Sequence, residues 1–335
     1  MPSHTHIVTT PDGLEALLGD LEGEGAIGLD TEFMRERTYR AELCLLQLTT
    51  RRGPMCIDPL ALDDLRPLAA ALGAGGPAKV LHAGRQDLEV LAPLLGAVAP
   101  LFDTQVAAAL AGFPAQIGYA ELTRRLLERE VPKGQTRTDW SRRPLSEAQV
   151  EYALDDVRHL LPLRERLVDE LERLRRLGWL AEELAALEAL DVVTVDAERA
   201  WLRFRGVEGW DAGRLRLLQS LAAWRERRAS ARNKPRGWIL DDTVLREIVL
   251  RVPRGRTALA ALEGMPEGVA KNSGDELLAL IEAAQVPDPP PPLPRRERPD
   301  PTLVARTKRL AEAAQRSEEH TSELQSRQYL VCRLL

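Results

Sequence analysis

Hydrophobic and polar positions in the first part of the chain alternate between two periods. Short apolar runs bounded by Gly, Pro or Asp predict β-strands, and apolar residues three and four positions apart predict helices. Strands are predicted over 6–10, Ala26–Phe33, Leu43–Thr49, Met55–Asp58 and 78–83, and helices over 11–21, 61–72 and 85–95. Hairpin-linked strands followed by strand–helix crossovers predict an α/β domain with a mixed sheet.

From about Gln105 onward the spacing of apolar residues is helical. A second, all-helical unit is predicted from about Asp211 to Ala284, with breaks at Pro235, Pro253 and Pro266. We therefore divide the chain into an α/β domain (1–175), a helical connector (176–208), an all-α bundle (209–285), a Pro-rich linker (286–302), the start of a further helical segment (303–316) and a tail (317–335).

The C-terminal segments have a different character. The stretch VPDPPPPLPRRERPDP predicts an extended linker, and TLVARTKRLAEAAQR predicts the start of an amphipathic helix. The final stretch, RSEEHTSELQSRQYLVCRLL, does not continue that helical period and resembles translated adapter sequence. We interpret 317–335 as a non-native tail, with a genuine disordered tail as the alternative, and assign no function to it.

Composition and charge narrow the class of protein. The formal net charge of −5 argues against indiscriminate nucleic-acid binding but leaves room for local basic patches. Cys44, Cys56 and Cys332 have neither the spacing of metal ligands nor that of a disulfide framework. The start lacks a signal-peptide pattern, and no apolar run reaches the roughly 20 residues that span a bilayer. We therefore expect a cytoplasmic protein without membrane contact.

Two acidic residues lie within the predicted strand Ala26–Phe33. Because strand side chains alternate between faces, Asp30 and Glu32 share one face with Gly28, opposite the apolar face. Neighbouring carboxylates repel, and partial burial raises the pKa of at least one of them unless a cation neutralises the pair. Magnesium or manganese ions, which prefer oxygen ligands, fit this pattern. An exposed edge strand with solvated acids is the alternative.

The stretch PLSEAQVEYALDDVRHLLPL predicts a single late helix. Ser146 and Gln149 have the spacing of a capping box, which marks where the helix begins. Apolar residues from Val150 to Leu161 recur at the helical period and form a buried stripe. The helix is therefore expected to pack one face against the core.

Polar residues on this helix and on an earlier one are further candidates. Tyr152 and Asp156 are four positions apart and lie on one flank, where Asp156 borders the apolar stripe and Asp155 is expected to face solvent. Asp87 lies in the first turn of the earlier helix. Taken alone, Asp87 can simply stabilise the helix dipole, and Tyr152 can be a surface aromatic.

The order of these residues resembles the tyrosine-bearing branch of the DEDD exonuclease superfamily. The stretches LDTEF, LFDTQVAAAL and TDWSRRPLSEAQVEYALDDVRHLLPL resemble the ribonuclease D family, and the second unit resembles its helicase-and-RNase-D C-terminal (HRDC) domain. The resemblance covers about Ile7 to Ala284. It implies an α/β ribonuclease H-like exonuclease domain with a mixed sheet, followed by an all-α helical bundle domain, and a truncated second helical repeat at 303–316.

The resemblance also implies roles for the individual acids. Asp30, Glu32, Asp87 and Asp156 would hold two divalent metal ions, Mg²⁺ or Mn²⁺, and Tyr152 would orient the attacking water. Two such ions stabilise the attacking and the leaving oxygen of a phosphodiester during in-line displacement. This chemistry would explain why a core strand carries paired acids.

Basic residues near these motifs are candidate contacts for nucleic acid. They are Lys133, Arg137, Arg142 and Arg143 before the late helix, and Arg225, Arg228, Arg232 and Lys234 in the second unit. Alternatively, the arginines pair with neighbouring acids and the second unit only packs against the nuclease. Phe33 and Trp140 are candidate stacking surfaces, although we expect Trp140 in the core, and His82 is expected to be structural.

We therefore predict a metal-dependent 3′–5′ exoribonuclease that releases nucleoside 5′-monophosphates. Its expected partner is RNA with a single-stranded 3′ end, such as a tRNA precursor, and a monomer is favoured. A 3′–5′ DNA exonuclease on the same fold is the nearest alternative, because the 2′-OH is distinguished by only one or two hydrogen bonds. A non-catalytic RNA-binding protein or a pure interaction module is disfavoured, because all four acids and Tyr152 are present.

Overall fold

The computed structural model describes residues 6–132, 138–189 and 196–284, together with residues 302, 305, 306, 308 and 309. These residues fall into two compact units, of which the first includes 6–34 and 42–189 and the second includes 35–41 and 196–284. The predicted tail 317–335 and the predicted Pro-rich linker up to residue 301 lie outside the described residues, as does most of 303–316.

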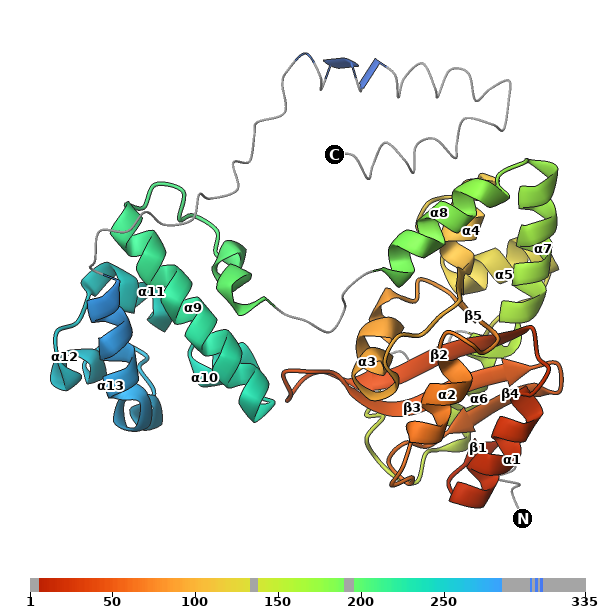
Figure 1. The fold of residues 1–335 in the computed structure, drawn as a ribbon, viewed down its shortest axis with the longest axis horizontal. Coiled ribbons are helices and arrows are strands. Elements are labelled where there is room, and N and C mark those ends of the chain that lie inside the picture. The colour runs from red at the N-terminus through yellow and green to blue at the C-terminus, as the bar shows by residue number, and fades with distance from the viewer. Residues whose placement is uncertain are drawn as a thin grey trace. The chain divides into compact units, whose positions relative to one another are not determined.

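A six-stranded mixed sheet forms the centre of the first unit (Figure 1). Its strands are β1 (Ile7–Val8), β2 (Ala26–Met34), β3 (Glu42–Thr50), β4 (Gly53–Ile57), β5 (Ala78–Leu81) and β6 (Leu101–Asp103), in the order β1-β4-β3-β2-β5-β6. The pairs β2–β3 and β3–β4 are antiparallel, whereas β1–β4, β2–β5 and β5–β6 are parallel. The predicted mixed sheet is confirmed. Strand β6 was not predicted, because three residues are too few to show a period.

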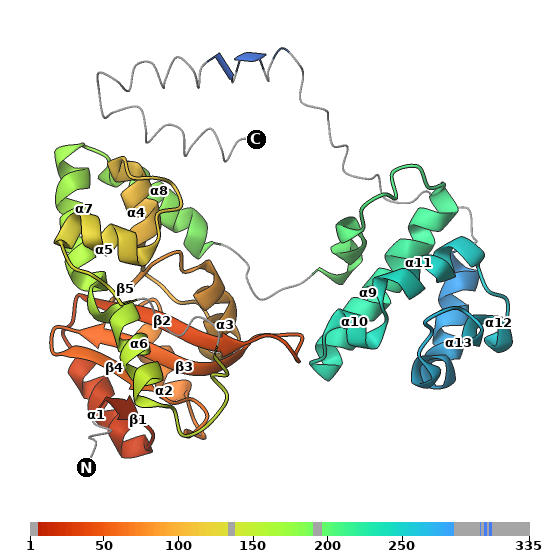
Figure 2. The same cartoon turned by 180° about the vertical axis from the view of Figure 1, so that it is seen from behind.

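Helices cover both faces of this sheet (Figures 1 and 2). One face is covered by α1 (Pro11–Leu21), α2 (Arg66–Leu72) and α3 (Arg85–Leu95), and the other by α6 (Glu147–Arg158) and the start of α7 (Leu160–Arg173). Helices α4 (Thr104–Ala111), α5 (Tyr119–Leu127) and α8 (Leu177–Glu188) pack around α7. Two helical layers therefore enclose β2 and β3, which are the longest strands in the described part of the chain.

The start of α6 confirms the predicted capping box. The Ser146 hydroxyl accepts a hydrogen bond from the Gln149 N–H, and the Gln149 side chain accepts one from the Ser146 N–H. The predicted single helix is wrong at its other end, because α6 stops at Arg158 and a separate α7 begins at Leu160. Pro162 explains the break, since it has no N–H to donate to the Arg158 carbonyl.

The second unit is all-helical. Its elements are a 3₁₀ helix η1 (Ala197–Arg203) and the helices α9 (Ala212–Arg232), α10 (Arg236–Ile239), α11 (Asp242–Arg251), α12 (Arg256–Ala260) and α13 (Glu267–Ala283). Its core contains Leu218 and Leu221 of α9, Ile248 of α11 and Leu277 of α13. The predicted helical connector (176–208) is therefore divided between the two units, because α8 belongs to the first unit and η1 to the second. None of the helices in the described ranges has the length and apolar character that a bilayer crossing requires.

Close packing at Gly28 generates a test of the fold. A Cβ at this position of β2 would collide with the Thr49 methyl group and would lie 3.1 Å from the Leu160 Cβ. We expect Gly28→Ala to lower the free energy of unfolding by about 1–3 kcal/mol, because an overpacked site must displace its neighbours. Urea unfolding followed by circular dichroism measures this change.

Gly19→Ala is the control for this substitution. Gly19 lies within α1, and no atom lies within 4 Å of a Cβ built there. Alanine should leave stability unchanged or raise it by up to about 1 kcal/mol, because Ala favours a helix over Gly. An unfolding midpoint of Gly28→Ala equal to that of the wild type would contradict the close packing of Thr49 and Leu160 against Gly28.

Candidate active site

Strand β2 carries Asp30 and Glu32 on the face that α6 and α7 cover. Gly28 precedes them on the same face, where its lack of a side chain lets Leu160 approach the sheet. Both acids are half-buried at the C-terminal end of the strand. The period-two alternation therefore places two carboxyl groups beneath a helix rather than in open solvent.

Asp87 reaches the same end of β2 from α3. It is buried, and the Thr31 hydroxyl donates to its Oδ1 at 2.5 Å. The turn before α3 is held by Asp103, whose two carboxylate oxygens accept the N–H groups of Ala83 and Gly84 at 3.1 and 3.0 Å. Ala83 adopts a φ of 57°, so these hydrogen bonds stabilise an uncommon backbone conformation. The LFDT stretch thereby fixes where α3 begins.

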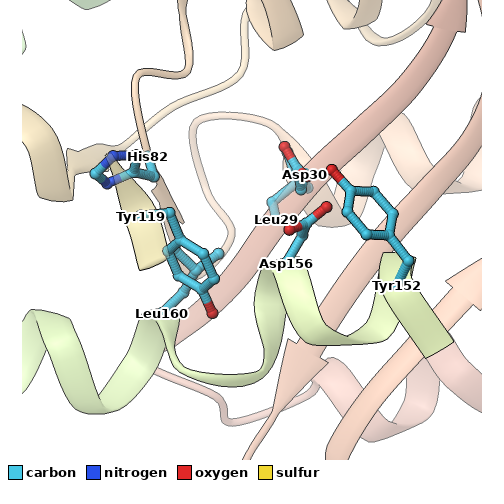
Figure 3. Close-up of a pocket in the computed structure, with 7 residues that line it drawn as sticks. All are labelled: Leu29, Asp30, His82, Tyr119, Tyr152, Asp156 and Leu160. Atoms are coloured by element: carbon cyan, nitrogen blue, oxygen red, sulfur yellow. The ribbon is translucent and has the colours of Figure 1, made fainter. Parts of the chain in front are cut away.

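Helix α6 supplies Tyr152 and Asp156. The Tyr152 hydroxyl is hydrogen-bonded to the Asp156 carboxyl group. Figure 3 shows this hydroxyl and the carboxyl groups of Asp30 and Asp156 pointing toward one another. The Tyr152 ring lies against Trp140, with 6.1 Å between the ring centroids, and Trp140 is 4% exposed. Trp140 is therefore a core residue that supports Tyr152, as expected.

The expectation that Asp155 faces solvent is wrong. Asp155 is buried, forms an ion pair with Arg158, and its main-chain carbonyl accepts the Tyr119 hydroxyl at 2.9 Å. Arg158 in turn also pairs with Glu151. Arg158 of the same helix and Tyr119 of α5 thus cover Asp155, and a projection of α6 alone does not include such neighbours.

A cavity of about 200 Å³ opens beside Asp30 and Asp156, whereas Glu32 and Asp87 are not among its lining residues. Its lining residues are Leu29, Asp30, His82, Tyr119, Tyr152, Asp156 and Leu160 (Figure 3). Both ring nitrogens of His82 are within 2.9 Å of hydrogen-bond partners, the Thr104 hydroxyl and the Ile117 carbonyl, which supports a structural role. Sequence reasoning did not identify Tyr119, whose place in the cavity depends on how α5 packs against the α6–α7 junction.

Burial raises the pKa of all four acids, and the charges of the other acids raise that of Asp30 and Glu32 further. Burial, and then the charges of Asp87, Asp156 and Glu32, raises the pKa of Asp30 well above its usual value. Burial and the charges of Asp156 and Asp87 raise the pKa of Glu32 to about 8. Burial raises the pKa of Asp87 to about 6 and that of Asp156 to about 7. The four groups therefore do not all ionise at neutral pH without a nearby cation.

The chemistry of this donor set fits a hard divalent cation. Asp30, Glu32, Asp87 and Asp156 offer only oxygen ligands, which suit Mg²⁺ or Mn²⁺ rather than zinc or copper. Asp30 is central, because the charges of the other three all raise its pKa. The described residues contain no preformed cluster of three such groups around one point, and repulsion between like charges opposes that convergence.

Arg143 has a different role from the expected phosphate contact. Its Nε and Nη2 donate to the two carboxylate oxygens of Asp58 at 2.5 and 2.7 Å. Its other N–H groups donate to the main-chain carbonyls of Cys44, Trp140 and Arg142 at 2.6–2.8 Å. Arg143 therefore ties the segment before α6 to β3 and to the end of β4, and its guanidinium is already occupied.

The other predicted basic residues of the first unit differ in exposure. Arg142 is 84% exposed, with one carboxylate oxygen of Asp139 at 3.7 Å. Lys133 and Arg137 lie outside the described residues. Arg142 is thus the member of this group whose side chain the structure shows to be accessible.

The basic residues of the second unit also divide into two kinds. Arg225 is buried and donates to a carbonyl and a carboxylate at the start of α11. Arg228 pairs with an acid of α13 and lies over a tryptophan ring. Arg232 and Lys234 are exposed, as is Trp238, which is 60% exposed and was not predicted to be functional. The one feature of the sequence that pointed to Trp238 as a contact residue was its position soon after Lys234.

Each of the two units matches the model of a different protein family. A model described as 3′-5′ exonuclease matches residues 5–172, and the HRDC domain model matches residues 214–281. The first match contains the mixed sheet and all four acids, and the second contains most of α9, the helices α10 to α12 and most of α13. In class, the protein is thus a 3′–5′ exonuclease joined to an HRDC domain.

Individual relatives narrow this class. Ribonuclease D of Gluconacetobacter diazotrophicus is 41% identical over 324 residues, which cover 94% of this chain and 81% of the relative. The crystal structure of Escherichia coli RNase D, described as an exoribonuclease involved in structured RNA processing, matches with a TM-score of 0.81 and 33% identity, over 96% of this chain and 88% of that one. The chain belongs to the ribonuclease D family and is a 3′–5′ exoribonuclease. The catalytic core of RRP6 from Trypanosoma brucei, at 22% identity and a TM-score of 0.63, shares its fold.

The raised pKa values predict how the stability of the metal-free protein depends on pH. Below about pH 3 the acids are protonated in both the folded and the unfolded state, so their burial costs no ionisation energy. As pH rises, the unfolded chain releases protons that Asp87, Asp156 and Glu32 retain up to pKa values of about 6, 7 and 8, so stability falls. We expect Asp30→Asn to flatten this fall and to be about 1–3 kcal/mol more stable than the wild type at pH 9.

Thermal or urea unfolding in chelator across pH 5–9 measures this difference. Glu15→Gln, on the exposed side of α1, is the control and should keep the wild-type slope. Saturating Mg²⁺ should reduce the slope of the wild type, because the cation binds the ionised acids. Equal slopes for Asp30→Asn and the wild type would show that the acids do not repel one another.

Proposed function

We propose that this exoribonuclease depends on two divalent metal ions and hydrolyses the last phosphodiester of a single-stranded RNA 3′ end. The observation that carries the proposal is that Asp30, Asp156 and Tyr152, from β2 and α6, line one pocket, while Glu32 and Asp87 lie near enough to Asp30 for their charges to raise its pKa. We further propose tRNA precursors among its substrates. The E. coli relative, which is described as acting in structured RNA processing, supports that extension.

The acids divide between two candidate metal positions. Asp30 would serve both ions, Glu32 and Asp156 would complete the first site, and Asp87 would hold the second. When bound, the ions would stabilise the charge that develops on the attacking and leaving oxygens. The hydrogen bond from Thr31 keeps Asp87 at the end of β2, so that it faces the other acids from α3.

Tyr152 would orient the attacking water. Burial and the nearby charge of Asp156 raise the pKa of its phenol, so the hydroxyl stays protonated and can donate a hydrogen bond. The Trp140 ring packs against the Tyr152 ring and holds its hydroxyl at the pocket. There the hydroxyl would donate its one proton to the water rather than to Asp156. The water oxygen would form a bond to phosphorus while the P–O3′ bond breaks. The products are a nucleoside 5′-monophosphate and an RNA shortened by one residue with a new 3′-hydroxyl.

The walls of the cavity would receive an unpaired terminal nucleoside. Leu29, Leu160, Tyr119 and His82 line it beside the acids, and they offer apolar and aromatic surface to a base and a ribose. A base that is paired in a duplex cannot present both of its faces to such a wall. Single-stranded ends are therefore the form of substrate that this pocket suits.

The second unit would hold RNA away from the reaction site. Arg232 and Lys234 are accessible cations at the end of α9, and Trp238 is an accessible ring that follows them. Cations and aromatic rings together bind single strands through phosphates and base stacking. Arg225 and Arg228 would instead stabilise the bundle, given their internal partners.

Substitution of the acids tests the catalytic proposal. Asp156→Asn should lower kcat on a 3′-tailed RNA oligonucleotide by about 10³-fold or more, because one metal site loses a ligand. Tyr152→Phe should lower kcat by about 10²-fold, because the water loses its orienting hydroxyl. The assay follows release of nucleoside 5′-monophosphates with Mg²⁺, Mn²⁺ or chelator, using RNA and a DNA of the same sequence.

Glu151→Gln is the matched control on the same helix. Glu151 is exposed and faces away from the pocket, so activity should stay within about twofold of the wild type. Full turnover by Asp156→Asn, or by the wild type in chelator, would refute metal-dependent hydrolysis. Degradation of the DNA at the same rate as the RNA would instead refute a preference for RNA.

Charge removal in the second unit tests the proposed RNA contact. The triple substitution Arg232→Gln, Lys234→Gln and Trp238→Ala should weaken binding to single-stranded RNA by about 10-fold. It should also make the plot of log K against log[salt] shallower by about 1.4, since each phosphate contact on a single strand contributes about 0.7. Fluorescence anisotropy with the inactive Asp156→Asn background measures both quantities.

Arg251→Gln is the control for this surface. Arg251 is exposed in the same unit but pairs with Glu247 of its own helix. Its loss should change neither the affinity nor the salt slope beyond the error of the measurement. Wild-type affinity and slope in the triple variant would indicate that the second unit only packs and does not contact RNA.

A further inference from the structure

A fully buried glutamine lies beside the central acid of the site. Gln47, in the middle of β3, is 0% exposed and lies directly opposite Asp30 of β2. Residues directly opposite each other in an antiparallel pair point to the same face and have Cβ atoms about 4.5–5.5 Å apart. The Gln47 side chain therefore lies next to Asp30 on the face that α6 covers.

The amide of Gln47 has no hydrogen-bond partner among the residues that the structure describes. Neither its Oε1 nor its Nε2 is bonded, although both atoms are inaccessible to solvent. A buried amide without partners is destabilising, whereas Leu or Met of similar size would carry no such cost. Core packing alone therefore does not explain an amide at this position.

The neighbours of Gln47 on this face provide an acceptor on one side and a donor on the other. Asp30 lies opposite it in β2, and Cys56 lies opposite it in β4. Cys56 is buried, and burial raises the pKa of its thiol to about 12, so it remains a neutral S–H group. An amide can donate to the carboxylate through its nitrogen and accept from the thiol through its oxygen at the same time.

We propose that Gln47 is a positioning residue for Asp30, donating its Nε2–H to the Asp30 carboxylate oxygen that faces the sheet. This hydrogen bond would turn the other oxygen of Asp30 toward the pocket, and the Cys56 thiol would hold the Oε1 end. The inference rests on the proposed role of Asp30 as the acid that serves both metal ions. It adds a residue from β3, a strand that supplies none of the acids.

A neutral amide suits this position better than a charged side chain. A lysine or arginine there would itself neutralise Asp30 and compete with divalent ions for it. A glutamate would add a fifth acid to four that already repel one another. Partners that orient a metal-binding side chain without binding the metal typically contribute 10- to 100-fold to metal affinity. The expected effect of losing the Gln47 amide is of that size.

Gln47→Met tests the proposal, since it keeps the length of the side chain and removes only the amide. Mn²⁺ affinity, measured by calorimetry without RNA, should fall by about 10-fold or more. On a 3′-tailed RNA, kcat at fixed subsaturating Mn²⁺ should fall by a similar factor, while KM for RNA stays within about twofold. The urea midpoint should change little, because methionine fills the same buried space as glutamine.

Two further variants complete the design. Gln47→Leu gives a second amide-free shape, so that poor fit of one side chain is not mistaken for loss of the hydrogen bond. Leu45→Met is the matched control, because Leu45 lies on the same face of β3, is fully buried and stands opposite Glu32. Leu45→Met should keep the Mn²⁺ affinity and kcat of the wild type.

Wild-type Mn²⁺ affinity and kcat in both Gln47 variants would overturn the proposal. A lower urea midpoint with unchanged Mn²⁺ affinity would overturn it as well, since Gln47 would then serve packing alone. If the proposed role of Asp30 in holding the metal ions is wrong, the results differ from these: Asp30→Asn retains activity and the wild type binds no Mn²⁺. Loss of activity in Asp30→Asn with full activity in Gln47→Met would reject only the role of Gln47.

Discussion

Mutual repulsion among four carboxyl groups is the constraint on which the rest of this structure depends. Asp30, Glu32, Asp87 and Asp156 each have a raised pKa, because burial disfavours their ionised forms, and the charges of the other acids add to this effect at Asp30 and Glu32. Such a site lowers stability unless a cation compensates it, so the surrounding packing has to hold the acids in place. The same repulsion explains why divalent metal ions suit the site.

Different structural features hold the individual acids in place. The strand period places Asp30 and Glu32 on one face of β2, and Asp103 fixes the turn from which α3 presents Asp87. The capping box sets the start of α6, and the buried Trp140 supports its Tyr152. Rigid strands and helices therefore determine the positions of the reactive groups, which is how a catalytic arrangement keeps its geometry.

The basic residues fall into two groups, those with internal partners and those that stay accessible. Arg143 and Arg225 are enclosed by carboxylates and carbonyls, so they stabilise their own units. Arg232 and Lys234 stay accessible in the HRDC domain. Because the chain carries a formal net charge of −5, attraction for RNA has to come from such local groups rather than from the overall field.

The sequence by itself determined what depends on neighbours along the chain. It predicted the mixed sheet, the shared face of Asp30 and Glu32, the capping box at Ser146 and the order of motifs that identified the family. Only the tertiary structure decided the burial of Asp155, the pairing of Arg143 with Asp58 and the place of Gln47 beside Asp30. The physical reason is distance along the chain. The period of a strand or helix says which face a side chain shares, but only folding determines which remote residues cover that face.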